Sequence, residues 1–249
     1  MPFAVVQAES GELDRASVRR AFERLDFLTQ HDADALALRL ATGILLRRLE
    51  RGRAEAATAA LIAEGIAAIA VDEAELLALP GAKMMRRMDA WPEALTLYDS
   101  LGRPQTVPWP HVVLVAAGVV SRRKVDYEER EWVGEKGHPM PYPYRVPIEG
   151  VRCEMSLEVL LDVEPLRLRV EPRNFDYRYL GDRKRQGAEH NFALLVSDLT
   201  ARSSGAILNR GAASMADGAG QVVVYESARQ FEEEVTWLIW RATAGSASG

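Results

Sequence analysis

The sequence predicts an α+β protein, with an N-terminal β-α-α-β-α-β module followed by a mostly antiparallel sheet domain with C-terminal helices. Three observations predict this class. Residues 43–71 read as a strand, an amphipathic helix and a second strand. Apolar residues alternate on both sides of a turn within residues 157–170, as in a β-hairpin. Ser227 and Gln230 form the capping box of a terminal helix with an apolar stripe.

The composition is that of a globular protein. The chain has 249 residues, of which 48% are hydrophobic and 27% are charged, which argues against a disordered or fibrous class. The net charge of −5 argues against general nucleic-acid binding, because such binding needs a basic face. Arginine and alanine are abundant, which is typical of a high-GC bacterial genome.

Three features predict a cytoplasmic location. Cys153 is the single cysteine, so the chain has no internal disulfide. The first residues lack the basic and apolar regions of a signal peptide. The longest apolar run, residues 112–120, has about half the length of a membrane span, so no transmembrane segment is expected.

The first domain is predicted over residues 1–79. Residues 3–7 suit a strand, and two helices follow, the first between Asp14 and Leu25 and the second capped by Thr29. Residues 44–49 suit a second strand. Gly65 lies where a third helix would end in a left-handed conformation, before a last strand at 66–71. The crossover rule places the last two strands in one sheet beneath that helix.

The order of these elements resembles the C-terminal domain of the large-subunit ribosomal stalk protein over residues 1–75. The parallel lies in the threonine-led second helix, the alanine-rich third helix, the Glu64-Gly65 ending and the short last strand. That family binds translation factors through a lysine-rich second helix, whereas this one reads HDADALALRL. The resemblance therefore implies the fold, reused as an interaction or regulatory module.

The second domain is predicted over residues 82–245, after a boundary at Ala78–Gly81. Its expected elements are an alternating strand at 93–100, a strongly apolar segment at 106–120 with Pro-Trp-Pro near its start, the hairpin at 157–170, a helix at 191–201 and the terminal helix. Residues 125–147 are expected to form an irregular insertion that crosses the surface. Residues 203–220 are small, polar and glycine-rich, as in a loop.

Residues 83–202 resemble bacterial pleckstrin-homology-type domains. The resemblance lies in several strands followed by a helix, with an edge strand, Pro-Trp-Pro and a long strand at the start. The insertion at 125–147 departs from that pattern. The resemblance implies an architecture and no particular function.

A polar cluster over residues 174–191 is the candidate catalytic site. Asp176, Arg183 and His190 lie there between an expected strand and an expected helix. A carboxylate, a guanidinium and an imidazole in one loop could support acid–base chemistry. The alternative interpretation is a solvated turn in which residues 189–191 start the helix.

Two compact basic triplets are candidate binding residues. They are Arg122-Arg123-Lys124, after the long apolar strand, and Arg183-Lys184-Arg185, within the polar cluster. On neighbouring loops they could hold a phosphate or a membrane headgroup. Alternatively, they are strand-end charges that protect sheet edges.

Aromatic residues of the insertion are candidates for contact with another protein. Trp132, Tyr142 and Tyr144 lie in a stretch that is charged and then rich in proline. The same residues could instead pack the insertion onto the core.

No metal or cofactor is predicted. The four histidines lack the spacing of zinc ligands, and the glycine-containing stretches do not match a P-loop or a dinucleotide-binding motif.

Three functions remain open from the sequence. The first is a cytoplasmic binding or regulatory protein, adaptor-like and without catalysis, whose partner is another protein. The second is an enzyme of unknown reaction centred on Asp176, Arg183 and His190. The third is an anion sensor that uses the two basic triplets. The oligomeric state is open.

Overall fold

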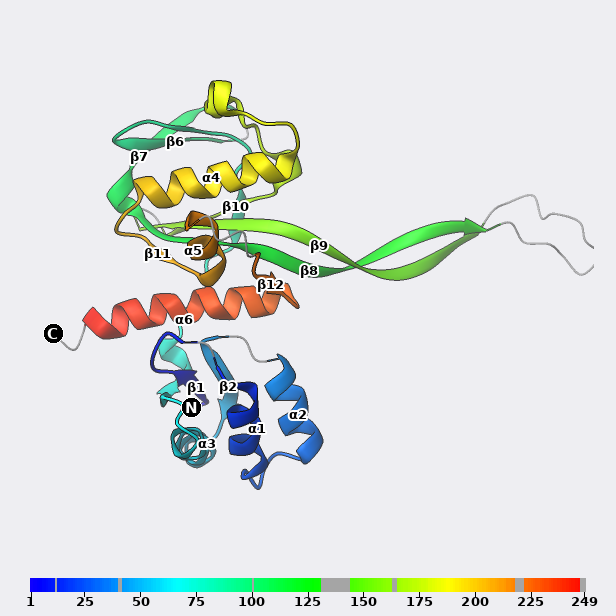
Figure 1. Cartoon of the computed structure of the whole chain (residues 1–249), viewed down its shortest axis with the longest axis vertical. Coiled ribbons are helices and arrows are strands. Elements are labelled where there is room, and N and C mark those ends of the chain that lie inside the picture. Colours follow the sequence, from blue (N-terminus) through cyan, green and yellow to red (C-terminus); the bar gives the residue numbers. More distant parts are fainter. Residues whose placement is uncertain are drawn as a thin grey trace, which may run out of the picture.

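The computed structural model describes residues 1–11, 13–39, 42–99, 101–130, 144–162, 165–217 and 222–246. Its helices and its antiparallel and mixed sheets confirm the predicted α+β class with C-terminal helices. Figure 1 shows the elements as stacked layers, with the N-terminal elements at one end and helix α6 between them and the larger sheet.

The N-terminal module has the predicted order of elements: β1 (Phe3–Gln7), α1 (Arg15–Glu23), α2 (Gln30–Arg39), β2 (Ile44–Leu49), α3 (Arg51–Ala63) and β3 (Ala68–Asp72), with the short helix η1 (Glu73–Glu75) after it. Strands β2 and β3 belong to one sheet, as expected. Strand β1 lies between them and is antiparallel to both. The three strands therefore form one sheet with β2 and β3 at its edges.

The helices of the module form where the sequence provides caps. The carboxylate of Asp14 accepts hydrogen bonds from the backbone N–H groups of Ala16 and Ser17 at the start of α1. Thr29 and Asp32 bond each other reciprocally at the start of α2. The apolar stripes of the helices then pack on the inner face of the sheet around Phe22 and Leu61, which are fully buried.

The larger sheet is built on β8 (Val112–Arg130) and β9 (Tyr144–Leu161), followed by β10 (Leu166–Val170). The predicted hairpin is confirmed by the antiparallel register from Leu166 opposite Leu161 to Val170 opposite Leu157. Three short strands pair in parallel at its borders: β4 (Ala82–Met84), β11 (Ile207–Leu208) and β12 (Val224–Tyr225).

The apolar run of β8 is explained by burial on both faces. Val115 and Ala117 pack with helix α4 (Ala188–Arg202) and helix α5 (Arg210–Ala216), whereas Leu114 and Ala116 pack with α6 (Ala228–Ser246). Because side chains alternate along a strand, a strand covered on both sides needs apolar residues at successive positions. Figure 1 shows α4 and α5 on one side of the sheet and α6 on the other.

Helix α6 contributes to one core that contains residues of both sheets. Phe231 and Val235 belong to a buried cluster with Val6 of β1 and Leu160 of β9. The indole Nε1 of Trp237 also donates a hydrogen bond of 2.7 Å to the carbonyl oxygen of Gln7. The division of the chain into domains 1–79 and 82–245 stays a prediction, but α6 joins the two sheets physically.

Glycine is required at position 43, where the chain passes α6. Gly43 has φ +114°, and a Cβ atom there would lie 2.7 Å from the ring of Trp237. A larger residue would be strained in its backbone and would displace the indole.

A third sheet contains β5 (Met88–Ala90), β6 (Ala94–Tyr98) and β7 (Pro104–Pro108), all antiparallel. The apolar segment expected over residues 106–120 is therefore divided between two strands. The short helix η2 (Trp109–His111) separates β7 from β8, and the two strands belong to different sheets. Proline at positions 108 and 110 fixes the backbone and removes ladder donors, which favours this corner.

Strands β8 and β9 continue beyond the sheet as a two-stranded ribbon (Figure 1). The irregular insertion expected over residues 125–147 is wrong at both ends, because residues 125–130 pair with residues 144–149. Pro147 is compatible with a two-stranded ribbon, where each strand is an edge. Residues 131–143 lie outside the described part of the chain.

Candidate functional site

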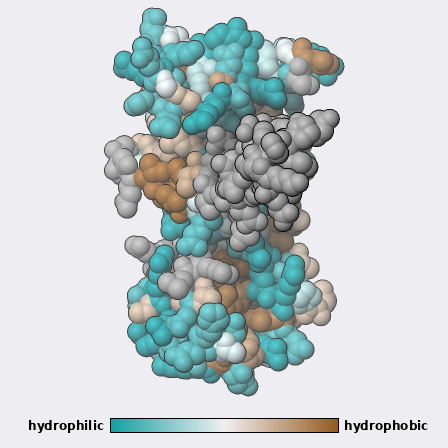
Figure 2. All heavy atoms as spheres, turned by 90° about the vertical axis from the view of Figure 1, so that its right-hand side faces the viewer, coloured by the Kyte–Doolittle hydropathy of each residue, from teal (hydrophilic) through white to brown (hydrophobic). Residues whose placement is uncertain are grey.

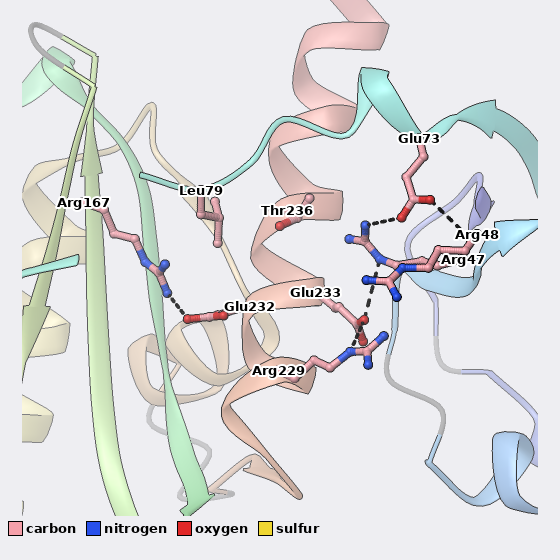
Figure 3. Close-up of a pocket in the computed structure, with 9 residues that line it drawn as sticks. All are labelled: Arg47, Arg48, Glu73, Leu79, Arg167, Arg229, Glu232, Glu233 and Thr236. Atoms are coloured by element: carbon pink, nitrogen blue, oxygen red, sulfur yellow. Dashed lines mark hydrogen bonds and ion pairs between the residues drawn. The ribbon is translucent and has the colours of Figure 1, made fainter. Parts of the chain in front are cut away.

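A polar cleft lies where the N-terminal module, α6 and β10 meet. It has a volume of about 420 Å³. Figure 3 shows side chains from these separate segments directed into it. Its lining is formed by Arg47, Arg48, Glu73, Leu79, Arg167, Arg229, Glu232, Glu233 and Thr236.

One wall of the cleft is a distorted edge of strand β2. The register between β1 and β2 shifts twice, and Arg48 has φ 58°, the one positive φ among the described residues other than glycine. Glu73 holds this conformation, because its carboxylate accepts from the backbone N–H of Arg48 at 3.2 Å and from Nη1 of Arg47 at 3.1 Å. A bulge of this kind changes the direction of neighbouring side chains. Here two arginines, Arg47 and Arg48, point into the cleft.

The opposite wall is one face of helix α6. Arg229, Glu232, Glu233 and Thr236 follow the spacing i, i+3, i+4 and i+7, which places all four on one side of a helix. Arg229 donates to Glu233 at 2.9 Å along this face. The helix is held in place by its apolar side in the shared core, so its polar side faces the cleft.

Arginine exceeds glutamate in the lining of the cleft. Glu73 accepts from Arg47, Glu233 from Arg229, and Glu232 from Arg167 at 2.7 Å. Among the described residues, the guanidinium of Arg48 has no hydrogen-bond or ion-pair partner. The Nε atom of Arg47 is buried without a hydrogen bond and lies 3.7 Å from Glu233.

A buried ion-pair cluster lies behind the cleft. Glu158 of β9 is fully buried and accepts from Arg167 and Arg169 of β10 at 2.7 to 2.9 Å. Glu232 of α6 accepts from both arginines as well. Burial lowers the pKa of the Arg167 guanidinium, but its hydrogen bonds to Glu158 and Glu232 outweigh that effect, so the pKa is raised.

The chemistry available in the cleft is recognition of an anion. Its lining offers guanidinium donors, which match the oxygens of carboxylates and phosphates. The described residues that line it include no histidine or cysteine that could act as a base or nucleophile at neutral pH.

The three candidate catalytic residues have separate partners in the structure. Asp176 pairs with Arg178 at 2.6 Å, and this hydrogen bond keeps the pKa of Asp176 below its usual value against a smaller effect of burial. Arg183 forms a bidentate pair with Asp198, with distances of 2.8 and 2.7 Å. His190 is exposed at the start of α4. Among the described residues, no hydrogen bond or ion pair joins the three.

The two basic triplets lie on different elements. Arg122 belongs to β8, where its Nε lies 3.9 Å from Glu154. Arg123 and Lys124 follow in the same strand, but their side chains lie outside the described residues. Arg183 ends η4 (Arg178–Arg183), and Lys184 and Arg185 are exposed after it. Within the described contacts, nothing joins the two triplets, so the anion sensor that would use them stays a prediction.

The aromatic side chains predicted to contact another protein lie outside the described part of the chain. Trp132 and Tyr142 lie outside the described residues, and Tyr144 begins β9 with a side chain that is also outside them. Figure 2 shows the face toward which the ribbon points as mostly hydrophilic, with hydrophobic residues in separate areas. The exposed large apolar residues come from several elements, including Ile62 of α3 and Val224 of β12.

Within the described ranges, no three histidine, cysteine or acidic residues are grouped as metal ligands. Among the described helices, none combines the length and hydrophobicity that a membrane span requires.

The cleft was not predicted from the sequence. Its residues come from β2, η1, β10 and α6, which lie far apart along the chain. One local signal was present, because the pair Arg47-Arg48 interrupts the apolar run of residues 44–49. Two charged residues in succession are unusual in a buried strand and indicate an irregular edge.

Comparison with protein-family models, curated proteins and solved structures gives no match for this chain. The resemblances to the ribosomal stalk domain and to pleckstrin-homology-type domains therefore stay predictions.

Proposed function

We propose that this chain is a non-enzymatic adaptor that binds another protein through the ribbon of β8 and β9. The observation that supports the proposal is the length of the ribbon. Its strands pair from Ser121 opposite Cys153 to Arg130 opposite Tyr144, and beyond Val120 no other described strand pairs with either of them.

The energetics of such a ribbon favour a binding role. A two-stranded hairpin is marginally stable in water, because it buries little apolar surface. Both of its edges offer backbone N–H and C=O groups that can pair with a strand of another protein. A partner that adds a strand or covers one face would stabilise the ribbon.

The composition of the ribbon favours a protein as the partner. Residues 121–154 contain seven basic and seven acidic residues, so the segment has no net charge with which to attract nucleic acid. The same segment contains four aromatic residues, Tyr127, Trp132, Tyr142 and Tyr144. Aromatic residues are enriched in protein interfaces, and tryptophan and tyrosine are frequent hot spots.

We also propose a cytoplasmic location. The chain has a single cysteine, Cys153, which is exposed and free. Secreted domains are commonly stabilised by disulfides, whereas cytoplasmic proteins keep their thiols reduced.

A shortened ribbon tests the adaptor role. In the variant, residues 124–150 are replaced by Asn-Gly, which closes a two-residue turn between Arg123 and Val151, a pair opposed in the register. We expect the variant to keep the Tm of the native chain and to lose the proteins that copurify with it from lysate of the source organism. Size-exclusion chromatography with light scattering shows whether a second copy is the partner.

A triple substitution tests the same binding role without a change in the length of the ribbon. Replacing Trp132, Tyr142 and Tyr144 with alanine keeps the length of the ribbon and should lose the same partner. If the shortened variant retains every partner of the native chain, the ribbon is not the binding element and the proposal is wrong.

A further inference from the structure

We infer that the cleft between β2 and α6 binds the phosphate group of a small phosphomonoester, with Arg48, Arg47 and Arg229 as the donors. This site is separate from the ribbon, and the inference does not depend on the adaptor role. It rests on the backbone of Arg48, on the arrangement of the three guanidinium groups and on the size of the cleft.

The backbone of Arg48 is held in a conformation that glycine adopts at lower energy. Its φ of 58° lies in the left-handed region, which is unfavourable for a residue with a side chain. Asn and Asp tolerate this region better than arginine does. Arg48 occupies a strained position, and its guanidinium has no partner among the described residues. This combination indicates that the side chain serves to bind a ligand.

The three guanidinium groups come from opposite walls of the cleft, Arg47 and Arg48 from β2 and Arg229 from α6. Figure 3 shows Arg47, Arg48 and Arg229 gathered around Glu233. Glu233 accepts from Arg229 at 2.9 Å and lies 3.7 Å from Nε of Arg47, beyond hydrogen-bond distance. Glu233 therefore holds Arg47 only loosely, and its hydrogen bond to Arg229 lies at an exposed site, so a phosphate oxygen can replace it as their acceptor.

Phosphate suits this arrangement better than a single carboxylate. A phosphomonoester has three acceptor oxygens and a charge between −1.5 and −2 near pH 7, so it can engage several guanidinium forks at once. Arginine offers bidentate recognition of such groups, which lysine does not. Glu73 already fixes Arg47 and the backbone of Arg48, so the donors are oriented before a ligand binds.

The cleft has room for more than a phosphate. Its volume of about 420 Å³ is in the range of sites for small molecules. Leu79, from the connector after η1, and Thr236 of α6 line it beside the charged residues. The organic part of the ligand would lie against these two side chains.

Isothermal titration calorimetry of the full chain tests the inference. The probes are inorganic phosphate, glycerol 3-phosphate and glycerol. We expect glycerol 3-phosphate to bind with 1:1 stoichiometry and more tightly than inorganic phosphate, and glycerol not to bind. Equal affinity for the two phosphates would show a free-phosphate site and would overturn the assignment to a phosphomonoester.

Two substitutions in the cleft separate ligand binding from structure. Arg48→Gly should weaken glycerol 3-phosphate binding at least 10-fold while Tm is unchanged or raised, because glycine relieves the backbone strain. Glu233→Gln should strengthen binding several-fold, because it removes the carboxylate that competes with phosphate. A purely structural ion-pair cluster would show neither effect.

Arg173→Ala is the matched control, since Arg173 is an exposed arginine of η3 (Pro172–Asn174). It should leave the affinity unchanged. If no phosphate binds, or if Arg48→Gly binds as the native chain does, the inference is wrong. The shortened ribbon should retain binding, so failure of the adaptor proposal can be distinguished from failure of this one.

Discussion

Two neighbouring groups of arginine and glutamate differ in their access to water. In the inner group, Glu158 is fully buried and the side chain of Arg167 is 6% exposed. In the outer group, which lines the cleft, the side chains of Arg47 and Glu233 are 25% and 20% exposed, and Arg48 is exposed as well. Glu232 of α6 lies between the two groups and accepts from Arg167.

Burial, and not residue type, decides whether an arginine can exchange its glutamate partner for a ligand. A buried charge that loses its partner cannot be solvated, so each inner residue depends on all the others. A charge at the surface is screened by water and contributes little when paired. The outer arginines can therefore exchange a glutamate for a ligand at small cost, whereas the inner ones cannot.

The largest effect is expected from Glu158→Ala. This change leaves Arg167 and Arg169 without their main acceptor inside the protein, which should lower the free energy of unfolding by about 3 to 5 kcal/mol. For a chain of this size that corresponds to a fall in Tm of roughly 6 to 20 °C. Thermal unfolding followed by circular dichroism measures it.

A double substitution serves as the control for that experiment. Replacing Glu158 and Arg167 together by methionine removes the two most buried charges and keeps apolar volume, and Arg169 retains Glu232 as an acceptor, so much of the lost stability should return. A fall in Tm no larger than that of an ordinary surface substitution would contradict the burial of this group.

Glu232→Gln tests the residue between the two groups. The side chain of Glu232 is 40% exposed, and Arg167 keeps Glu158 as an acceptor when the charge at 232 is removed. We expect a loss of about 1 kcal/mol, intermediate between the inner and outer groups. Urea unfolding at fixed ionic strength gives the value, and a loss as large as that of Glu158→Ala would remove the distinction between the groups.

Arg48→Gly should act in the opposite direction. Glycine adopts the left-handed conformation without strain, and this gain exceeds the greater entropy of the unfolded chain, so the variant should be about 0.5 to 1 kcal/mol more stable. Urea unfolding measures the difference. Arg48→Ala keeps the strain and is the control, for which no gain is expected.

The smallest effect is expected from Glu233→Gln. Its partners Arg229 and Arg47 are exposed or half-buried, so the change should alter the free energy of unfolding by less than about 0.5 kcal/mol. The variant should also become less sensitive to added salt, which the same measurement at two salt concentrations would reveal. A loss above 1 kcal/mol would place Glu233 with the inner group.

The fold of the N-terminal module could be predicted because its signals are local. Caps at Asp14 and Thr29, apolar stripes at helical spacing and short apolar strands follow one another in the order observed. The hairpin of β9 and β10 was predictable for the same reason, since alternation and a turn lie within a few residues.

The predictions from the sequence were wrong where contacts between separate segments of the chain determine the structure. The strands of the ribbon pair with each other. Tyr144, Val146 and Ile148 alternate with polar residues or proline, but the prolines at 139, 141, 143 and 147 favoured the prediction of a loop. Helix α5 lies in the expected loop because Asn209 anchors it. The side chain of Asn209 bonds both backbone groups of Ala117 and caps the helix at Ala212. No sequence pattern around Asn209 indicates a partner 92 residues away.

The cleft could not be predicted because it exists only when α6 lies between the two sheets. Arg47 and Glu233 are far apart along the chain and come within 3.7 Å through that packing. The residue pattern within one segment does not show which distant segment will pack against it. Local periodicity predicts the elements and leaves their mutual placement open.

The position of α6 has a consequence for synthesis on the ribosome. The helix covers strands β1, β2 and β8, and all of them are translated before it. A nascent chain that has not yet reached Ala228 therefore presents two uncovered apolar sheet faces to water or to a chaperone. Both sheets are therefore covered only after the residues of α6 have been translated.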